Sequence, residues 1–315
     1  METITKRAKQ PALSGTGEQV LTQYERRLRT EEDLTAATVR NYLSDLRHFA
    51  AWCEALWKQG REDEPAFTPG TVTTPTLTDY RAHLQQELHL KPNSVNRSLV
   101  SLKRYFVWLL STGQIKSDPA KAVKLVGEEV SAPRHLDDQE EQRLLATVTE
   151  TGSLRDRAII VLMLHTGLRT RELCTLMRAQ VRLGKRSGAI TVHGKHNKYR
   201  EIPLNATARA VLLAYDPSLQ KPQSGPTPLF LSERRHMQLT ERGLGYLIQK
   251  YAVKARVSDV SPHDLRHRFG YRMAQSVPLH RLAQLMGHDS LDTTMRYVQA
   301  TKQDLQQDVE RIAWE

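Results

Sequence analysis

The stretch Ser261–Val298 reads SPHDLRHRFGYRMAQSVPLHRLAQLMGHDSLDTTMRYV and carries four reactive side chains in a fixed order. His263 and Arg266 stand three residues apart on an expected helix, so both can face one cluster of oxygens. His288 follows a glycine at the expected end of a second helix, where another donor can reach the same cluster. Tyr297 brings a hydroxyl able to hold a phosphoryl group covalently. This set is typical of a phosphodiester transfer site.

A second arginine, Arg169, lies upstream in the segment TGLRTREL. Negative charge grows on the non-bridging oxygens of a phosphodiester under attack, so a catalyst without a metal needs fixed cationic donors. Arginine suits this task, because its guanidinium stays protonated and its planar fork matches two phosphate oxygens. We therefore expect Arg169 and Arg266 to flank the phosphate. Glu172 lies three residues after Arg169 on the same face of an expected helix, so it can orient the guanidinium or satisfy the helix N-terminus, and we favour orientation.

No metal and no other cofactor is expected. The sequence contains no G-x-x-x-x-G-K-[ST] phosphate loop and no carboxylate cluster spaced for paired magnesium ions. His263 and His267 have the i, i+4 spacing of zinc ligands, but the H-E-x-x-H glutamate and a supporting cysteine pair are missing.

A basic run lies in the middle of the chain and is expected to follow a phosphate backbone. Seven basic residues precede Glu201 without an intervening acid: Arg178, Arg182, Lys185, Arg186, Lys195, Lys198 and Arg200.

The order Arg169, Lys195, HDLRH, LMGH and Tyr297 resembles the tyrosine recombinase family, which includes phage integrases and Xer proteins. The resemblance implies that Tyr297 attacks DNA and forms a 3′-phosphotyrosyl link. It implies that Lys195, in HGKHNKYREIPL, protonates the leaving 5′-oxygen. Because this link conserves the energy of the phosphodiester for religation, the reaction needs no ATP.

The same resemblance implies a site-specific recombinase that works through a Holliday junction, for integration, excision or dimer resolution. Its partners would be double-stranded DNA with specific recombination sites and further copies of itself, as a tetramer on two sites. Accessory proteins are also possible partners. Four residues depart from the family pattern without removing a catalytic group: Arg171, His196, Arg268 and Gly270.

Helical spacing of apolar residues predicts that the first third of the chain is all helical. We expect a flexible tail over residues 1–16, a helical core-binding, DNA-binding domain over 17–111 and a linker over 112–133. Four apolar blocks carry the helical prediction, beginning near Val20, Val39, Leu77 and Val95. Thr35 and Asn93 are candidate caps for the second and fourth helices.

Residues 134–315 are expected to form the catalytic domain. The pieces VRL, AITVH and YREIPL between Val181 and Leu204 predict a small antiparallel sheet. The fold class is therefore mainly α with a small antiparallel β-sheet. Helices are expected over 137–148, 154–165, 206–214, 240–255, 263–275, 279–286, 291–299 and 302–313. The last carries Leu305, Val309 and Ile312 and is expected to contact a neighbouring protomer.

Composition favours a polyanionic partner. The chain has 315 residues, with 46 Lys and Arg against 35 Asp and Glu, giving a net charge of +11. Its two cysteines, Cys53 and Cys174, lie far apart, which favours a reducing compartment. Apolar runs are much shorter than the roughly 18 residues of a membrane span. We expect a soluble, cytoplasmic protein without a membrane partner.

Two other functions compete with recombination: DNA relaxation of the type IB topoisomerase kind, and DNA binding without catalysis. The expected core-binding domain and final helix favour recombination over the first, and the intact reactive set weighs against the second. Several basic residues are weaker candidates for DNA contacts, because helical surface charges are often only solvated. They are Arg40, Arg47, Arg97, Lys103, Arg104, Arg171, His196, Lys198 and Arg200.

Overall fold

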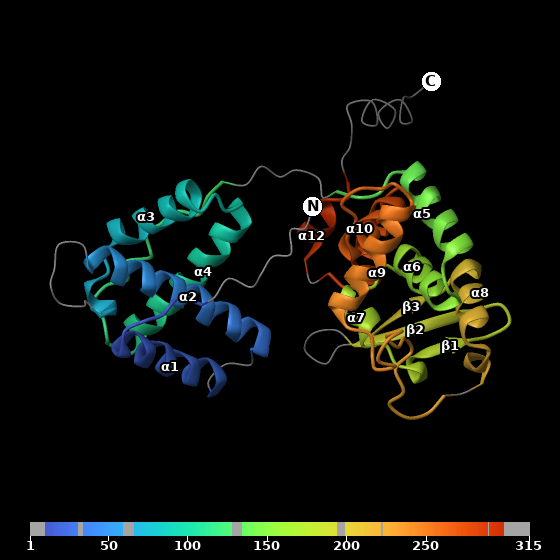
Figure 1. The fold of residues 1–315 in the computed structure, drawn as a ribbon, viewed down its shortest axis with the longest axis horizontal. Helices are drawn as coiled ribbons and strands as arrows, with labels where there is room; N and C mark the ends of the chain where they lie inside the picture. Colours follow the sequence, from blue (N-terminus) through green and yellow to red (C-terminus); the bar gives the residue numbers. More distant parts are fainter. Residues whose placement is uncertain are drawn as a thin grey trace, which may run out of the picture. The chain divides into compact units, whose positions relative to one another are not determined.

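The computed structural model describes residues 10–30, 34–58, 66–127, 134–193, 199–221, 223–288 and 290–298. The chain divides into two compact units, Met1–Val130 and Ser131–Glu315. Helices dominate both, and a single three-stranded antiparallel sheet lies among the described residues of the second (Figure 1). The predicted fold class is confirmed.

The first unit is built from helices at the predicted apolar blocks. They are α1 (Gly15–Thr30), α2 (Ala36–Lys58), α3 (Thr74–Ala82) and α4 (Pro92–Ser111), with the short 3-10 turn η1 (Pro69–Thr71) and the π turn η2 (His83–Glu87). Helix α2 packs against α1 and α4. Phe49, fully buried on α2, lies 5.0 Å from Tyr80 and 6.3 Å from Phe106 between ring centroids. These three rings are buried in the core, so they cannot stack on nucleic-acid bases.

The start of the first unit differs from the prediction. Helix α1 begins at Gly15, inside the expected tail of residues 1–16, because Ser14 is fixed to α2. The backbone N–H and the hydroxyl of Ser14 donate to the Glu54 carboxylate at 3.0 and 2.6 Å. Asn93 is not a cap: α4 begins one residue earlier at Pro92, and proline suits the first helical position.

Part of the expected linker packs on the first unit. Ala120 and Val123 are buried in its core, and the side chain of Asn96 on α4 exchanges hydrogen bonds with the backbone of Val126 at 3.0 and 2.8 Å. Residues 112–127 therefore belong structurally to the helical unit, although they form no long helix.

The second unit surrounds one buried helix, α6 (Leu154–Thr166), which packs against α5, α8 and α10. The other helices are α5 (Asp138–Thr151), α7 (Thr170–Cys174), α8 (Ala206–Tyr215), α9 (Glu241–Lys254), α10 (Pro262–Ala274), α11 (Leu279–Met286) and α12 (Leu291–Met295), with 3-10 turns η3 (Arg178–Gln180) and η5 (Pro217–Gln220). A helix was expected to carry Arg169 and Glu172, but the bounds of the short α7 were not predicted, and α12 ends four residues before its predicted end. The predicted helix 302–313 lies outside the described residues.

The sheet pairs β1 (Val181–Leu183), β2 (Gly188–His193) and β3 (Tyr199–Pro203) in sequence order. Ile190 in the central strand lies opposite Val181 on one side and Ile202 on the other. All three side chains are buried in the core of the unit. Period-two alternation in β3 then places Arg200 on the same face as Ile202, toward the interior.

A tight turn after α6 prepares the site. Gly167 ends the helix in the left-handed conformation with φ of 61°. A Cβ atom at this position would collide with the ring of Phe269 on α10. Glycine is therefore required for conformation and for space, and the turn leads directly to Arg169.

Candidate active site

The structure brings Arg169, Arg266, His288 and Tyr297 together from four separate elements. Arg169 is the N-cap of α7, Arg266 lies within α10, and His288 and Tyr297 each lie two residues after the end of a helix, α11 and α12 respectively. Helix α10 contacts α6 and α11, and α11 contacts α12 and β3. Residues far apart in the sequence thus share one region of the second unit.

Arg266 is held by three partners and is only 5 % exposed. It donates to the Gly167 carbonyl, to the Met286 carbonyl at 2.8 Å and to His288 Nε2 at 3.0 Å. Burial and the nearby positive charge of Arg169 lower the pKa of Arg266 to about 10. The guanidinium therefore remains a cation at neutral pH, fixed where the α6 turn meets the end of α11.

Glu172 binds two arginines, Arg169 and Arg200, of which only Arg169 was an expected partner. Its carboxylate accepts the backbone N–H of Arg169 at 2.7 Å and the Arg169 guanidinium at 2.9 Å. It also accepts both terminal nitrogens of Arg200, at 2.7 and 2.8 Å. Burial would raise the pKa of Glu172, but the hydrogen bonds from Arg200 and Arg169 outweigh it and hold that pKa below its ordinary value.

Arg200 differs from the expectation of a surface DNA contact. Its side chain is only 11 % exposed, and besides Glu172 it donates to the Leu285 carbonyl at 3.1 Å. A Cβ on Gly287 would lie 2.6 Å from an Arg200 nitrogen, so the left-handed glycine also lets this arginine approach. The alternation of β3 carried the signal for this inward position, which our sequence analysis missed. Arg200 therefore holds the Glu172 carboxylate in place by donating to both of its oxygens.

The hydrogen-bond partners of His288 determine which of its ring nitrogens carries the proton. Arg266 can only donate, so His288 Nε2 must accept its hydrogen bond. The proton then lies on Nδ1, which donates to the buried Thr294 hydroxyl at 2.7 Å. Burial and the charge of Arg266 lower the pKa of His288 to about 4, which keeps the ring neutral near pH 7. Thr294 was not among the predicted site residues.

Tyr297 is buried against α10. Its side chain is 4 % exposed, and its hydroxyl lies 2.9 Å from His267 Nδ1. The ring stacks near His288 with centroids 6.2 Å apart and meets Tyr271 edge-on at 5.3 Å. Burial raises the pKa of Tyr297, and the charges of Arg266 and Arg296 offset only part of this effect.

His263 lies on the same helix as Arg266 but is exposed. His263 is exposed in the first turn of α10, 6.4 Å from His267 between ring centroids. Asp264 accepts the N–H and the hydroxyl of Ser261, both at 2.7 Å, and so fixes the start of that helix. Lys195, His196 and Lys198 lie outside the described residues. No group of three or more candidate metal ligands occurs in the described parts of the chain.

A buried ion-pair cluster links α10 to α5. Arg268 donates to Glu141 at 2.5 Å and to Asp138, and Arg272 donates to Glu141 at 2.8 Å. Arg268 and Glu141 are both almost fully buried. The atypical arginine after HDLRH therefore ties the helix of His263 and Arg266 to the first helix of the unit.

Most candidate DNA-contact residues of the first unit have partners within the chain. Arg47 pairs with Glu18, Arg97 donates to Asp45 at 2.8 Å and Lys103 donates to the Ala120 carbonyl at 2.6 Å. The Arg104 guanidinium lies 5.5 Å from the Tyr42 ring centroid. Arg40, and Arg171 in the second unit, are exposed.

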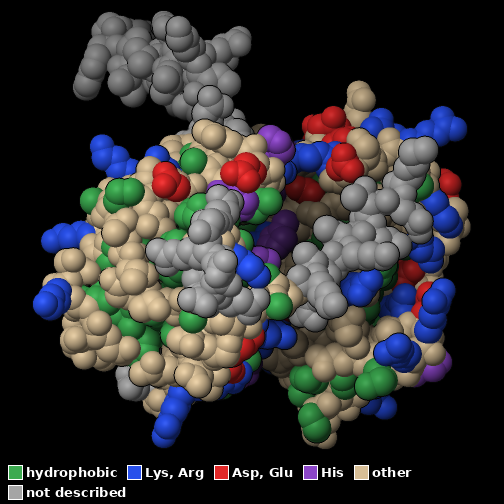
Figure 2. All heavy atoms as spheres, turned by 60° about the vertical axis from the view of Figure 1, so that its left-hand side comes forward, with side chains coloured by type: hydrophobic (Ala, Val, Ile, Leu, Met, Phe, Trp, Pro, Cys, Tyr) green, Lys and Arg blue, Asp and Glu red, His purple; other side chains and the backbone are tan. Residues whose placement is uncertain are grey.

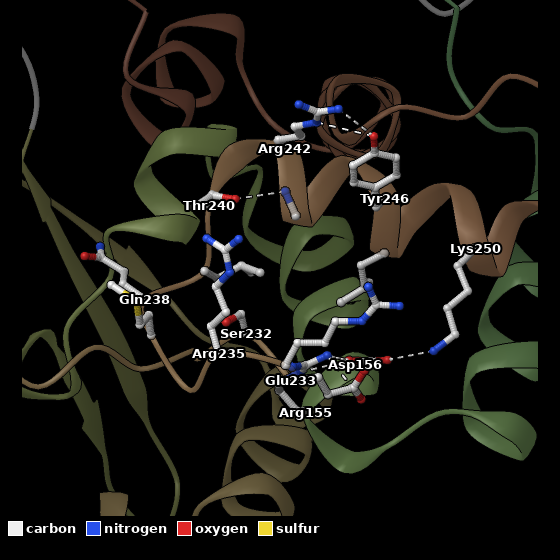
Figure 3. Close-up of a pocket in the computed structure, with 15 residues that line it drawn as sticks. Arg155, Asp156, Ser232, Glu233, Arg235, Gln238, Thr240, Arg242, Tyr246 and Lys250 are labelled. Carbon is white, nitrogen blue, oxygen red and sulfur yellow. Dashed lines mark hydrogen bonds and ion pairs between the residues drawn. The ribbon is translucent and has the colours of Figure 1, made fainter. Parts of the chain in front are cut away.

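A groove of about 910 Å³ lies beside α9 in the second unit (Figure 3). The start of α6, the loop 232–240 and α9 line it, with Arg235 and Arg242 among the labelled side chains (Figure 3). Arg242 donates to the Tyr246 hydroxyl at 2.9 Å, and Tyr246 is 63 % exposed. Sequence analysis did not single out this basic and aromatic surface.

Basic side chains occur across the face drawn in Figure 2, with acidic ones among them, so both signs of charge are interspersed on this face. None of the helices in the described parts of the chain is long and apolar enough to cross a bilayer.

Comparison with known proteins gives two family matches. A model described as "Phage integrase family" matches residues 134–304, and one described as "Phage integrase, N-terminal SAM-like domain" matches residues 21–113. "Tyrosine recombinase XerC" of Myxococcus xanthus is 32% identical over 300 residues, covering 91% of this chain and 95% of that protein. "Tyrosine recombinase XerD" of Listeria monocytogenes is 30% identical over 282 residues, covering 86% and 91%.

Solved structures share the fold at low identity. The integrase of transposon Tn1549 in complex with a circular intermediate DNA has a TM-score of 0.71 at 19% identity, covering 93% of this chain and 99% of that one. The XerH site-specific recombinase bound to a palindromic difH substrate has a TM-score of 0.70 at 18% identity, covering 96% and 98%.

Proposed function

Because the chain belongs to the phage integrase family, the tyrosine recombinases, we propose that it is a site-specific recombinase that cuts and rejoins DNA through Tyr297. The observation that carries this proposal is the convergence of Arg169, Arg266 and His288 beside Tyr297. Arg169 reaches the Gly287 carbonyl and Arg266 reaches His288, so both arginines gather at the end of α11.

The proposed reaction transfers one phosphodiester. The phenolic oxygen of Tyr297 gives up its proton to water, attacks phosphorus and forms an O–P bond, while the bond from phosphorus to the 5′-oxygen breaks. Lys195 gives a proton to that leaving oxygen. A 5′-hydroxyl of the partner strand then reverses these steps, which releases the tyrosine and passes through a Holliday junction.

The cationic donors act on the charge that grows on the phosphate oxygens. Arg169 and Arg266 carry fixed charges at neutral pH, and their carbonyl and carboxylate partners hold them in place before DNA arrives. His288 is neutral and has a defined tautomer, so it can act as a hydrogen-bond donor only if its ring partners rearrange. His263, exposed at the start of α10, is a further donor facing solvent.

The proposed partner is double-stranded DNA carrying specific recombination sites. The λ integrase dimer with a TM-score of 0.67 is described as bound to a core site, and the XerH and Tn1549 proteins are described in complexes with DNA. We extend the proposal to a tetramer on two sites, to accessory proteins and to a cytoplasmic location. The exposed surface of Arg242 and Tyr246 adds a candidate DNA contact in the second unit.

The two competing functions are less well supported. Whole-length similarity to Xer recombinases favours strand exchange over relaxation of supercoils. The intact set of Arg169, Arg266, His288 and Tyr297 favours catalysis over DNA binding alone.

Capture of covalent complexes separates the three functions. Wild-type and Tyr297→Phe protein are mixed with nicked, fragmented genomic DNA, quenched with detergent, and the protein-linked ends are sequenced. We expect ends clustered at one site with wild type and none with the variant. Scattered ends would favour a topoisomerase. No ends, despite demonstrated DNA binding by both proteins, would contradict the proposed chemistry.

A further inference from the structure

We propose that His267 and Gly270 form a seat on α10 that holds Tyr297 in a protected position, which the tyrosine leaves in order to attack. The inference rests on the proposed function for the role of Tyr297 as nucleophile. His267 is then a positioning residue, because it acts on the tyrosine and not on DNA. The two residues are three apart on the helix and so share one face.

The Tyr297 ring can pack on Gly270 only because glycine has no side chain. A Cβ at this position would lie 2.8 Å from both Cε1 and Cζ of Tyr297, closer than real Cβ atoms come to their neighbours. Glycine within a helix is destabilising relative to alanine, because it loses more conformational freedom on folding. Gly270 has an ordinary helical backbone, so the space it leaves for the tyrosine explains its presence.

The hydroxyl end of the ring is fixed by His267. The 2.9 Å contact joins Tyr297 Oη to His267 Nδ1, and Tyr271 closes the side of the ring. With 4 % of its surface exposed, the seated side chain cannot meet the phosphate of a DNA duplex.

The surroundings of the seated phenol keep it protonated. The groups that face it are His267, His288, Tyr271, Arg266 and Arg296. Burial and the neighbouring His263 lower the pKa of His267 to about 4, so this imidazole brings no positive charge to the phenol. Burial raises the pKa of Tyr297 despite the two arginines. A seated tyrosine is therefore a poor nucleophile.

The segment that carries the tyrosine can leave at low cost. Helix α12 has five residues, and its apolar side chains Leu291 and Met295 are 51 % and 52 % exposed. Val298, next to the tyrosine, is 45 % exposed. A short element with few buried apolar contacts opens locally more readily than the core. Thr294 and Tyr297 are its buried anchors.

Nitration by tetranitromethane tests the seat without DNA, because the reagent attacks the phenolate. Sites are quantified by mass spectrometry after digestion. Tyr199 and Tyr246, 60 % and 63 % exposed, serve as reactive standards, and Tyr251, 1 % exposed in the core, reports unfolding. Burial shields the Tyr297 ring from the reagent and raises its pKa, which lowers its fraction of phenolate. We expect wild-type Tyr297 to react at least about tenfold more slowly than the two standards, because it is 4 % exposed against their 60 % and 63 %.

Two variants open the seat, and one matched glycine serves as control. Gly270→Ala pushes on the ring, and His267→Leu removes the hydroxyl partner while keeping bulk. Gly245→Ala is the control, because Gly245 also lies within a helix but a Cβ there would meet nothing within 4 Å. We expect both seat variants to bring Tyr297 close to the rate of Tyr199, with Tyr251 still protected and the control unchanged.

Several results would overturn the seat. One is nitration of wild-type Tyr297 as fast as Tyr199, and another is continued protection in both seat variants. Deprotection by Gly245→Ala would also contradict a specific seat. If Tyr251 is also nitrated in Gly270→Ala, that variant is unfolded, and the nitration of Tyr297 in His267→Leu then tests the seat. Because no DNA is used, these outcomes are separate from the capture assay: a protected Tyr297 that never links to DNA would sink the proposed function and leave the seat intact.

Discussion

Arg266 illustrates how single residues build this site. Its charge is useful for phosphate chemistry, yet in the free protein it donates to two carbonyls and to His288. Glu172 performs the same task for Arg169 and Arg200. Fixed donors of this kind stabilise developing charge without reorganising at the moment of reaction. The pairing therefore prepares the site at the level of individual hydrogen bonds.

Removal of one donor tests this view. We expect Arg266→Ala to raise the activation barrier for covalent capture at the identified DNA site by on the order of 3 kcal/mol, which lowers the rate roughly a hundredfold. Arg281→Ala, at an exposed position on α11, is the matched control and should cleave normally. Folding of both variants is checked by urea unfolding. Cleavage by a folded Arg266→Ala protein at the control rate would remove Arg266 from the mechanism.

Two half-buried histidines predict a loss of stability in acid. The pKa values of His267 and His288 fall from 6.5 to about 4 on folding, so the unfolded chain binds more protons between these values. The free energy of unfolding should therefore be unaffected above pH 6.5 and should decline as the pH falls toward 4. Both rings are partly exposed, which makes the decline smaller than the full shifts imply.

Urea midpoints at pH 7.5 and pH 5 measure this decline. The double variant His267→Leu with His288→Gln should lose less stability across the same interval than wild type. An equal loss in both proteins would assign the acid sensitivity to other groups.

At the scale of elements, α10 is the organising helix of the second unit. It carries Arg266, seats Tyr297 and is tied to α5 through Arg268 and Glu141. Both members of this ion pair are buried, and removal of one partner leaves the other uncompensated. This ion pair between Arg268 and Glu141, here called the clamp, therefore fixes the helix on which the chemistry depends.

Arg268→Ala measures the strength of the clamp. The change leaves the Glu141 carboxylate buried with Arg272 as its remaining partner, and broken buried pairs typically cost about 3–5 kcal/mol. Because Arg272 remains, we expect the lower end of this range in urea unfolding. Arg143→Ala, exposed on the same α5, is the control. Equal unfolding free energies of the two variants would show that the clamp adds no stability.

The elements that the sequence predicts well are those with strong local signals. Apolar spacing located the long helices, and the Asp137 capping box lies at the predicted start of α5. The short α7 has only five residues and depends on contacts with α9, which local spacing does not encode. Asn93 has cap chemistry, but Pro92 sets the start of α4.

Within the site, residue order indicated which side chains would gather, but not their partners. Arg200 was predicted as a DNA contact, because a charge run carries no information about burial. Its inward direction depends on the register of β3, and its partners come from α7 and α11. Thr294 and His267 were missed because their contacts join residues 6 and 30 positions apart.

At the scale of the whole molecule, two units and a net charge of +11 favour extensive contact with a phosphate backbone. Each phosphate that a protein neutralises adds about −0.9 to the slope of log affinity against log salt. If six phosphates are contacted, the slope is about −5. Titration of full-length protein with a duplex at several salt concentrations measures it. Affinity that does not change with salt would contradict an electrostatic DNA partner.

Identification of the residue that becomes linked to DNA shows whether Tyr297 is the nucleophile. Wild-type protein is trapped on a nicked duplex, the complex is digested with nuclease and protease, and the nucleotide-bearing peptide is sequenced by mass spectrometry. We expect a 3′-linked nucleotide on Tyr297 and a free 5′-hydroxyl on the released strand. A nucleotide on another residue, such as Tyr271, or a released strand with a 5′-phosphate would contradict it.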